Sequence, residues 1–253
     1  MAAAPTLATE HLDMTTTTRT TARLAGALYL LASVGFLAVF TWLAARFGYP
    51  DVLDRPAADV LPALLGLGTT GRAVWAVYAT LPLLLVPAAL ASEAVLGVVA
   101  PARLRAATAL QMIAAVAMVV GLARWPSLQW RLAEAWPAAD VMTRQMLTTV
   151  FDGANTYLGN WIGEFLGEVA LYGAFVLLGS SLIGAGDRAG LPRWGRWVGW
   201  LGILAGVTGE VAAFRNVTPL VAPAAEAANL LLPAFLIGFG FVMIRMPGAH
   251  ERS

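Results

Sequence analysis

The sequence predicts an all-α fold, a polytopic bundle of six transmembrane helices with two interfacial amphipathic segments on its outer side. Three observations predict it. Of the 253 residues, 59% are hydrophobic and only 12% are charged, whereas roughly a quarter of the residues in soluble domains carry charge. The mean hydropathy is +0.72. The chain also contains six apolar stretches, each near the length of about 20 residues that one helical crossing of a bilayer needs.

In chain order, we expect a first tail, one transmembrane domain at residues 22–246 and a second tail at residues 247–253. Residues 1–21 are rich in Thr and Ala without apolar periodicity, which predicts a disordered cytoplasmic tail, and Met14 is a second candidate start codon. The first apolar run is longer than a signal-peptide core and lacks a small-residue cleavage site, so we expect an uncleaved span. The six spans are expected at residues 24–45, 73–96, 106–123, 157–182, 197–214 and 224–244.

Two loops on the outer side are long and carry apolar residues at helical spacing, at residues 56–67 and 137–151. Such segments lie in the outer membrane interface or cap the bundle. A lid over a cavity is the alternative with a functional role.

The distribution of Arg predicts the orientation, because short cytoplasmic loops carry an excess of basic residues. The compact loops on one side hold Arg19, Arg23, Arg103, Arg105, Arg188, Arg193, Arg196, Arg245 and Arg252. On the other side, Arg residues are spread through longer loops that also hold Asp and Glu. We therefore expect a multi-pass protein of the cytoplasmic membrane with both termini in the cytoplasm.

The three odd-numbered spans share a pattern that starts at a basic residue. The aligned triplets are Arg23, Arg105 and Arg196; Gly26, Thr108 and Gly199; Leu28, Leu110 and Leu201; Leu31, Ile113 and Leu204; Ala32, Ala114 and Ala205; and Val34, Val116 and Val207. This pattern predicts three helical hairpins related as a parallel repeat. The alternative explanation is the positive-inside rule acting on a chain in which Ala, Leu and Val are abundant.

Residue types that are absent exclude several kinds of chemistry. Without Cys there is no disulfide, thiolate metal site or thiol nucleophile, and without Lys there is no Schiff base. His11 and His250 lie in the tails, so neither a haem held between membrane helices nor a His-based zinc site is expected. We therefore expect no cofactor and no metal. A net charge of +1 gives no reason to expect nucleic-acid binding.

The fourth span carries a stripe of polar residues. Asn160, Glu164, Glu168 and Tyr172 recur every four residues and therefore lie along one helix face. Two carboxylates one turn apart are costly in lipid, so the stripe must face the bundle interior or water. Their proximity also disfavours ionisation of both at once, because each negative charge repels the other. We interpret the stripe as a candidate site for a ligand or a proton.

Further polar residues are expected at a similar depth, in the outer half of the membrane. They are Arg124 in the third span, Glu210 and Arg215 in the fifth, and Glu226 and Asn229 in the sixth. Together with the stripe they predict an outward-facing polar cavity between spans four, five and six. The structural alternative is that Glu164 or Glu168 pairs with Arg124 or Arg215 and only sets the helix register.

Two further features of the spans predict contacts between helices. Gly159, Gly163 and Gly167 form a ridge of small residues beside the polar stripe, which lets another helix approach closely, so a partner helix is expected there. Gln111 is the lone amide of the inner part of the third span and is expected to hydrogen-bond to a neighbouring helix.

Three short motifs carry a resemblance to a known family. They are RLAGALYLL at 23–31, YPDVL at 49–53 and LGNWIGE at 158–164. On these motifs the chain resembles a bacterial family of six-helix integral membrane proteins known mainly as a domain of unknown function, over residues 22–244. The resemblance implies a membrane bundle and implies no particular activity.

These features favour a membrane protein that binds a small molecule, a lipid or a cation in the outward-facing cavity, with proton-coupled transport as one mechanism. Glu164 and Glu168 would share a proton, and Arg215 or Arg124 would bind an anionic group. Two alternatives stay open. One is an enzyme that uses a buried Glu for acid–base chemistry on a lipid or isoprenoid substrate. The other is a structural or regulatory membrane subunit.

Overall fold

The computed structural model describes residues 7–185 and 191–246, with side-chain positions from residue 17 onward except at Asp54. These residues form helices and short connections without strands. Within them, six helices are long and apolar enough to cross a membrane. They are Thr17–Phe47, Gly68–Leu96, Pro101–Ala138, Val141–Ala185, Gly195–Asn216 and Pro219–Ile244. The expected six-helix fold is therefore confirmed, and the chain is a multi-pass membrane protein. Arg188, Arg252, His250 and residues 247–253 lie outside the described residues.

The first span is a single helix, and the second and third are built from several helical segments. The 3-10 and π-helical segments carry the label η. The first span is α1 (Leu7–Phe47), followed by η1 (Asp51–Asp54) and α2 (Ala57–Gly66). The second combines α3 (Gly68–Thr80), η2 (Leu81–Leu84) and α4 (Leu85–Leu96). The third combines α5 (Pro101–Ala123), the π-helix η3 (Trp125–Gln129), α6 (Trp130–Ala135) and η4 (Trp136–Ala138).

The last three spans follow in the same manner. The fourth combines α7 (Val141–Ala154), the π-helix η5 (Asn155–Leu166) and α8 (Gly167–Ala185). The fifth combines α9 (Gly195–Ala212) and η7 (Ala213–Asn216), and the sixth combines η8 (Pro219–Val221) and α10 (Ala222–Ile244).

The spans extend beyond the apolar stretches of the sequence. The helix α1 begins at Leu7, inside the tail for which the composition predicts disorder. Once the apolar part has nucleated a helix, each added residue gains one backbone hydrogen bond without a new nucleation cost, so a Thr-rich extension stays helical.

Asp140 caps α7 because its Oδ1 atom accepts a hydrogen bond from the backbone N–H of Thr143 at 2.8 Å, and this bond lowers the pKa of Asp140.

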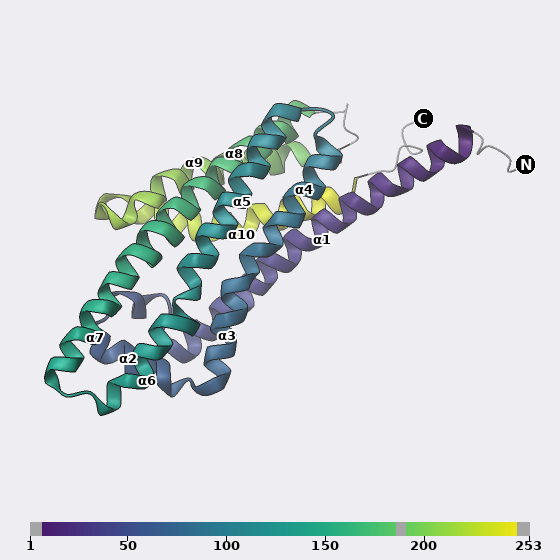
Figure 1. Ribbon diagram of the computed structural model, residues 1–253. Coiled ribbons are helices and arrows are strands. Elements are labelled where there is room, and N and C mark those ends of the chain that lie inside the picture. The colour runs from purple at the N-terminus through teal and green to yellow at the C-terminus, as the bar shows by residue number, and fades with distance from the viewer. Residues whose placement is uncertain (1–6, 186–190, 247–253) are drawn as a thin grey trace, which may run out of the picture.

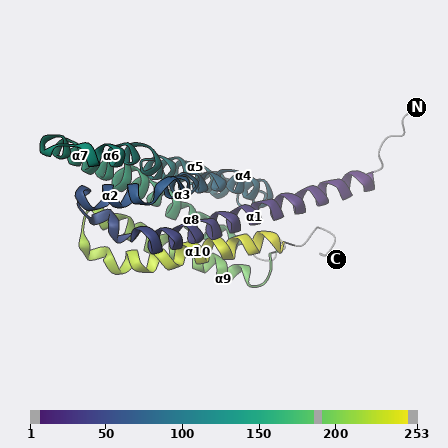
Figure 2. The ribbon, with the colours of Figure 1, turned by 90° about the horizontal axis from the view of Figure 1, so that it is seen from below.

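The six spans form a closed ring. Each span packs against its neighbours in sequence, and α10 closes the ring by packing against α1. Figures 1 and 2 show α2, α6 and α7 at one end and the ends of α1 and α10 that lead to the termini at the other. We call these the cap end and the terminal end. An even number of spans places both chain termini on one side of the bundle.

Two hydrophobic cores fill the ring. The larger core runs between all six spans and contains Tyr29, whose hydroxyl donates to Gln111 Oε1 at 2.8 Å. Gln111 therefore does bond to another helix, as the sequence predicts. The smaller core lies at the cap end and is aromatic, with the rings of Trp75 and Trp125 stacked at a centroid distance of 4.8 Å.

The two amphipathic segments take different positions. The segment at 56–67 forms α2, whose Val60, Leu61 and Leu64 are fully buried in the cap-end core, so it caps the bundle. The segment at 137–151 is largely α7, which continues without a break into η5 and α8. An interfacial position is confirmed for neither segment.

Candidate functional site

Two carboxylates of the fourth span share one guanidinium of the fifth. Arg215, in η7, donates from Nη1 to Glu168 Oε2 at 2.6 Å and from Nη2 to Glu168 Oε1 at 2.7 Å. Its Nη2 atom also lies 3.1 Å from Glu164 Oε2. Pairing between the stripe and Arg215, which the sequence raises as the structural alternative, is therefore present.

An amide completes the group. Asn216 Nδ2 donates to Glu164 Oε2 at 2.9 Å and lies 3.4 Å from the backbone oxygen of Asn160. We call Glu164, Glu168, Arg215 and Asn216 the carboxylate cluster. Both donors to Glu164 use the same oxygen, Oε2, so Glu164 Oε1 accepts no hydrogen bond from the described residues. The Glu164 side chain is 25% exposed and that of Glu168 is 15% exposed.

Glycines in α9 bring the two spans close enough for these bonds. A Cβ atom at Gly209 would overlap the ring of Tyr172, and one at Gly206 would lie 2.8 Å from the Tyr172 backbone oxygen. These glycines let α9 lie directly against α8, which places Arg215 beside Glu168 one turn beyond Tyr172. The position of the cluster thus depends on Gly206 and Gly209, which carry no functional side chain but allow the two helices to approach closely.

Arg124 lies apart from the carboxylates. Its side chain is buried between η3 and η5, where Nε donates to Asn155 Oδ1 at 3.0 Å, Nη1 donates to the backbone oxygen of Gly121, and the guanidinium stacks on Trp125 at 5.2 Å. It forms no ion pair with a described residue. The guanidinium also packs against Gly159. Arg124 therefore joins the third and fourth spans through neutral groups, and its charge attracts Glu164 without forming an ion pair with it.

The remaining predicted residues do not join the cluster. Tyr172 is buried, and its ring packs edge-on against Phe175 at 5.7 Å. Glu210 lies beside Gly173 of α8 without an ion pair to the described residues. Glu226 and Asn229 are exposed on α10 and form no hydrogen bond with the described residues. The structure thus brings Glu164, Glu168 and Arg215 together. It places Glu210 beside Gly173 and leaves Glu226 and Asn229 exposed on α10, apart from the cluster.

The glycine ridge of the fourth span packs inside the chain. A Cβ atom at Gly163 would lie 2.8 Å from the Cα atom of Gly121 in α5, and one at Gly167 would lie 3.1 Å from Met118. Together with Gly159 against Arg124, all three glycines face the third span. The helix that packs against the ridge is α5 of the same chain.

Two surface hollows of about 550 Å³ lie at the terminal end. One is lined by Pro192, Trp194, Gly238, Phe241 and Arg245, and the other by Leu90, Glu93, Ala94, Gly97, Val98, Pro101 and Arg105. Neither hollow contains a residue of the carboxylate cluster or any other predicted site residue. Among the described residues, no group of three or more His, Cys, Asp or Glu side chains is arranged to hold a metal ion.

Sequence reasoning missed Asn155 and Gln129. Asn155 Oδ1 accepts from both Arg124 Nε and Gln129 Nε2, each at 3.0 Å. Asn155 precedes Asn160 by five residues, which is the hydrogen-bond spacing of a π-helix, whereas the predicted stripe assumes four residues per step. Burial and, to a smaller extent, the negative charge of Glu164 together raise the pKa of Tyr49 to about 12, so Tyr49 stays neutral at physiological pH.

Comparison with known proteins agrees with this architecture. No curated protein and no solved structure matches the chain. Residues 24–243 match the family described as a domain of unknown function, DUF4386. The matched region runs from the first span to the last, so it takes in the whole ring and the carboxylate cluster. The resemblance expected from the three motifs is confirmed, and the chain belongs to the DUF4386 family.

Proposed function

We propose that the protein binds a proton or a small organic cation at Glu164, in the carboxylate cluster. The observation that carries the proposal is the sharing of one guanidinium by two carboxylates, with Glu168 held through both oxygens and Glu164 through Oε2 alone. Within the carboxylate cluster, two negative charges face one positive charge, and the buried Arg124 attracts Glu164 from outside the cluster without forming an ion pair with it. A surplus carboxylate in a membrane span is costly unless it is neutralised, and a bound cation neutralises it.

The geometry favours Glu164 Oε1 as the acceptor. This atom has no hydrogen-bond donor among the described residues, while both oxygens of Glu168 are taken by Arg215. A structural pairing of the fourth and fifth spans would be complete with Glu168 and Arg215. The second carboxylate adds little to that pairing, which supports a role in binding.

Aromatic rings beside the cluster suit a cation with an apolar surface. Phe165 packs edge-on against Trp161 at 5.2 Å and against Phe214 at 5.3 Å, so the three rings connect the same two spans as the cluster. Trp161 and Phe214 are each 46% exposed. Ring faces attract ammonium groups, most strongly where water is scarce. The proposal covers binding and does not extend to transport.

Infrared difference spectroscopy across a pH series, with the protein in nanodiscs, tests the proposal. The wild-type protein should show the C=O stretch of a protonated carboxyl group that disappears at alkaline pH. Glu164→Gln should remove this band. Glu168→Gln should weaken it, because Arg215 then pairs with Glu164 alone and favours its ionised form. Tetramethylammonium added at constant pH should perturb the carboxylate stretches of the wild type and leave those of Glu164→Gln unchanged.

The matched control is Glu226→Gln, since Glu226 is an exposed carboxylate that forms no ion pair with the described residues. This variant should keep both responses. The proposal is wrong if the wild type shows no titrating carboxyl band and no response to tetramethylammonium, or if Glu164→Gln retains both.

A further inference from the structure

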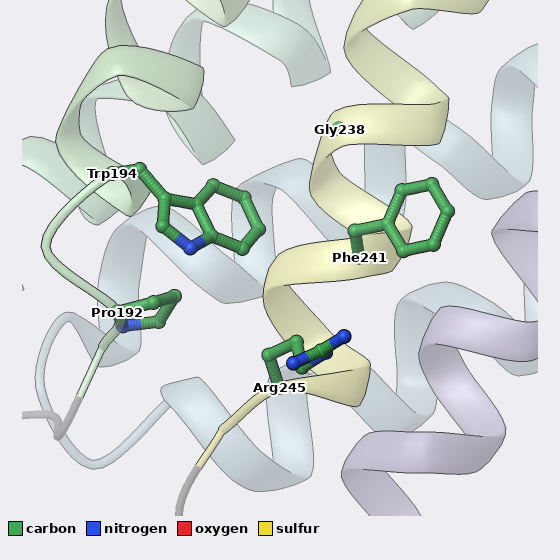
Figure 3. Close-up of a pocket in the computed structure, with 5 residues that line it drawn as sticks. All are labelled: Pro192, Trp194, Gly238, Phe241 and Arg245. Carbon is green, nitrogen blue, oxygen red and sulfur yellow. The ribbon is translucent and has the colours of Figure 1, made fainter.

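A hollow lies between α9 and α10 at the terminal end, and both a basic residue and apolar residues line it. Its residues are Pro192 and Trp194 before α9, and Gly238, Phe241 and Arg245 on α10. Figure 3 shows the Trp194 indole on one side of the hollow and the Phe241 and Arg245 side chains on the other. The volume of about 550 Å³ is sufficient for a polar headgroup.

The described charged residues around this hollow are basic. Arg245 is exposed and forms no ion pair with the described residues, and the same holds for Arg193 and Arg196 on either side of Trp194. No acidic residue is among the described residues that line the hollow. The N-terminus of α9, an 18-residue helix that begins at Gly195, adds the positive end of its dipole. The other hollow differs, because Glu93 accompanies Arg105 in its lining.

The wall toward the middle of the bundle is apolar. Gly238 has no side chain, and a Cβ atom there would lie 3.3 Å from Val198 of α9, so the hollow narrows to the crossing of the two helices. Phe241 is 48% exposed beside it, and Trp194 is 40% exposed. An occupant with an anionic head and an apolar chain fits both the charge and the lining.

We propose that this hollow binds an anionic phospholipid. Its phosphate group accepts hydrogen bonds from the Arg245 guanidinium and from the Trp194 indole N–H, and an acyl chain lies along Phe241 and Gly238. Basic pockets between transmembrane helices recognise anionic headgroups in this way, and indoles concentrate at the same depth of the membrane. This site is distinct from the carboxylate cluster and does not depend on the function proposed there.

Native mass spectrometry of the delipidated protein tests the proposal. The first phosphatidylglycerol molecule should bind more tightly than phosphatidylcholine with the same acyl chains. Arg245→Gln should weaken phosphatidylglycerol binding about fivefold, the factor expected for one Arg beside an anionic lipid. Trp194→Phe keeps the ring but loses the N–H donor and should weaken binding by a smaller factor. Gly238→Leu should weaken binding without a change of charge, because its side chain occupies the site of the acyl chain.

The matched control is Arg144→Gln, since Arg144 is an exposed Arg stacked on Trp136 at 5.5 Å at the cap end. It should leave phosphatidylglycerol binding unchanged. Equal binding of the two lipids by the wild type, or equal losses in Arg245→Gln and Arg144→Gln, overturns the proposal. Inorganic phosphate that displaces phosphatidylglycerol completely, with Gly238→Leu binding as tightly as the wild type, also overturns it and identifies a site for free phosphate.

Discussion

At the scale of single residues, the interior of the bundle has few polar contacts, and one of them crosses its centre. Tyr29 and Gln111 are 0% and 1% exposed, and their hydrogen bond links the first span to the third. The Gln111 amide nitrogen lies 3.4 Å from the backbone oxygen of Ala107. Neither side chain can exchange its partner for water. The bond therefore fixes how α1 and α5 are rotated with respect to each other.

We expect Tyr29→Phe to destabilise the protein by about 1 kcal/mol, because it leaves the Oε1 atom of Gln111 buried without a donor. Gln111→Leu should cost less, since the Tyr29 hydroxyl loses Gln111 Oε1 but keeps Ser92 as a hydrogen-bond partner. The double variant should lose less than the sum of the two, because no polar group is then left unpaired. Thermal unfolding in detergent, followed by tryptophan fluorescence, measures the three differences. Strictly additive losses would contradict a direct interaction.

Residue identity predicted part of the candidate site and not the rest. Glu164, Glu168 and Arg215 were predictable because charged side chains in membrane spans must find one another. Glu226 and Asn229 were misplaced because hydropathy does not reveal which face of an apolar helix points inward, and α10 is apolar on most sides. The burial of Arg124 between neutral groups was also not predictable, since it depends on two π-helical segments for which the sequence carries no clear signal.

At the scale of elements, the contact between the third and fourth spans is made by backbone rather than side chains. The Cα atoms of Gly121 and Gly163 face each other, and Gly159 and Gly167 extend the contact along η5 and into α8. Helices that approach this closely gain dispersion contacts along their backbones, which replace the hydrophobic effect as the source of association in lipid. The predicted ridge of small residues was therefore correct in its role, and its partner is α5.

We expect Gly163→Leu to separate α5 from η5 and to lower the apparent melting temperature strongly or prevent folding, because its Cβ atom would already lie 2.8 Å from the Cα atom of Gly121. Gly153→Ala is the matched control in the same span. Gly153 is exposed, and a Cβ atom there would meet nothing within 4 Å. This control should stabilise α7 by about 0.5–1 kcal/mol. A Gly163→Leu variant that melts with the wild type would show that the close contact does not form.

At the scale of the whole molecule, the three odd-numbered spans have equivalent environments at the aligned positions. Outward positions of the aligned pattern are similarly exposed, with 57%, 47% and 55% for Leu31, Ile113 and Leu204. Inward positions are buried, at no more than 7% exposure. They are Ala32, Ala114 and Ala205. The positive-inside rule explains the aligned Arg residues. It does not explain why the aligned Leu and Ile positions are all exposed and the aligned Ala positions are all buried. The ring thus favours the repeat over chance similarity.

Orientation can be measured because the chain has no Cys. We expect the cap end to face outward, since the short loops at the terminal end hold most of the compact basic clusters. A membrane-impermeant maleimide should label Val141→Cys and Leu220→Cys in intact cells, and Val98→Cys only after permeabilisation. All three positions are about equally exposed, at 86%, 87% and 87% respectively. The opposite labelling pattern would reverse the orientation, and the unmodified protein should not be labelled in either state.

The π-helix η5 sets the rotation of the helix that follows it. Over twelve residues its backbone bonds run from i to i+5 rather than from i to i+4, so this segment takes more residues per turn than the α-helices on either side. If one π-helical turn became an α-helical turn, it would hold one residue fewer, and the helix that follows would rotate by about 100°. Glu164 lies within this segment and Glu168 just after it, so such a step carries both carboxylates away from Arg215 while α7 stays in place. The π-helical register of η5 therefore decides whether Glu164 and Glu168 face Arg215, although none of its turns touches the guanidinium through backbone atoms.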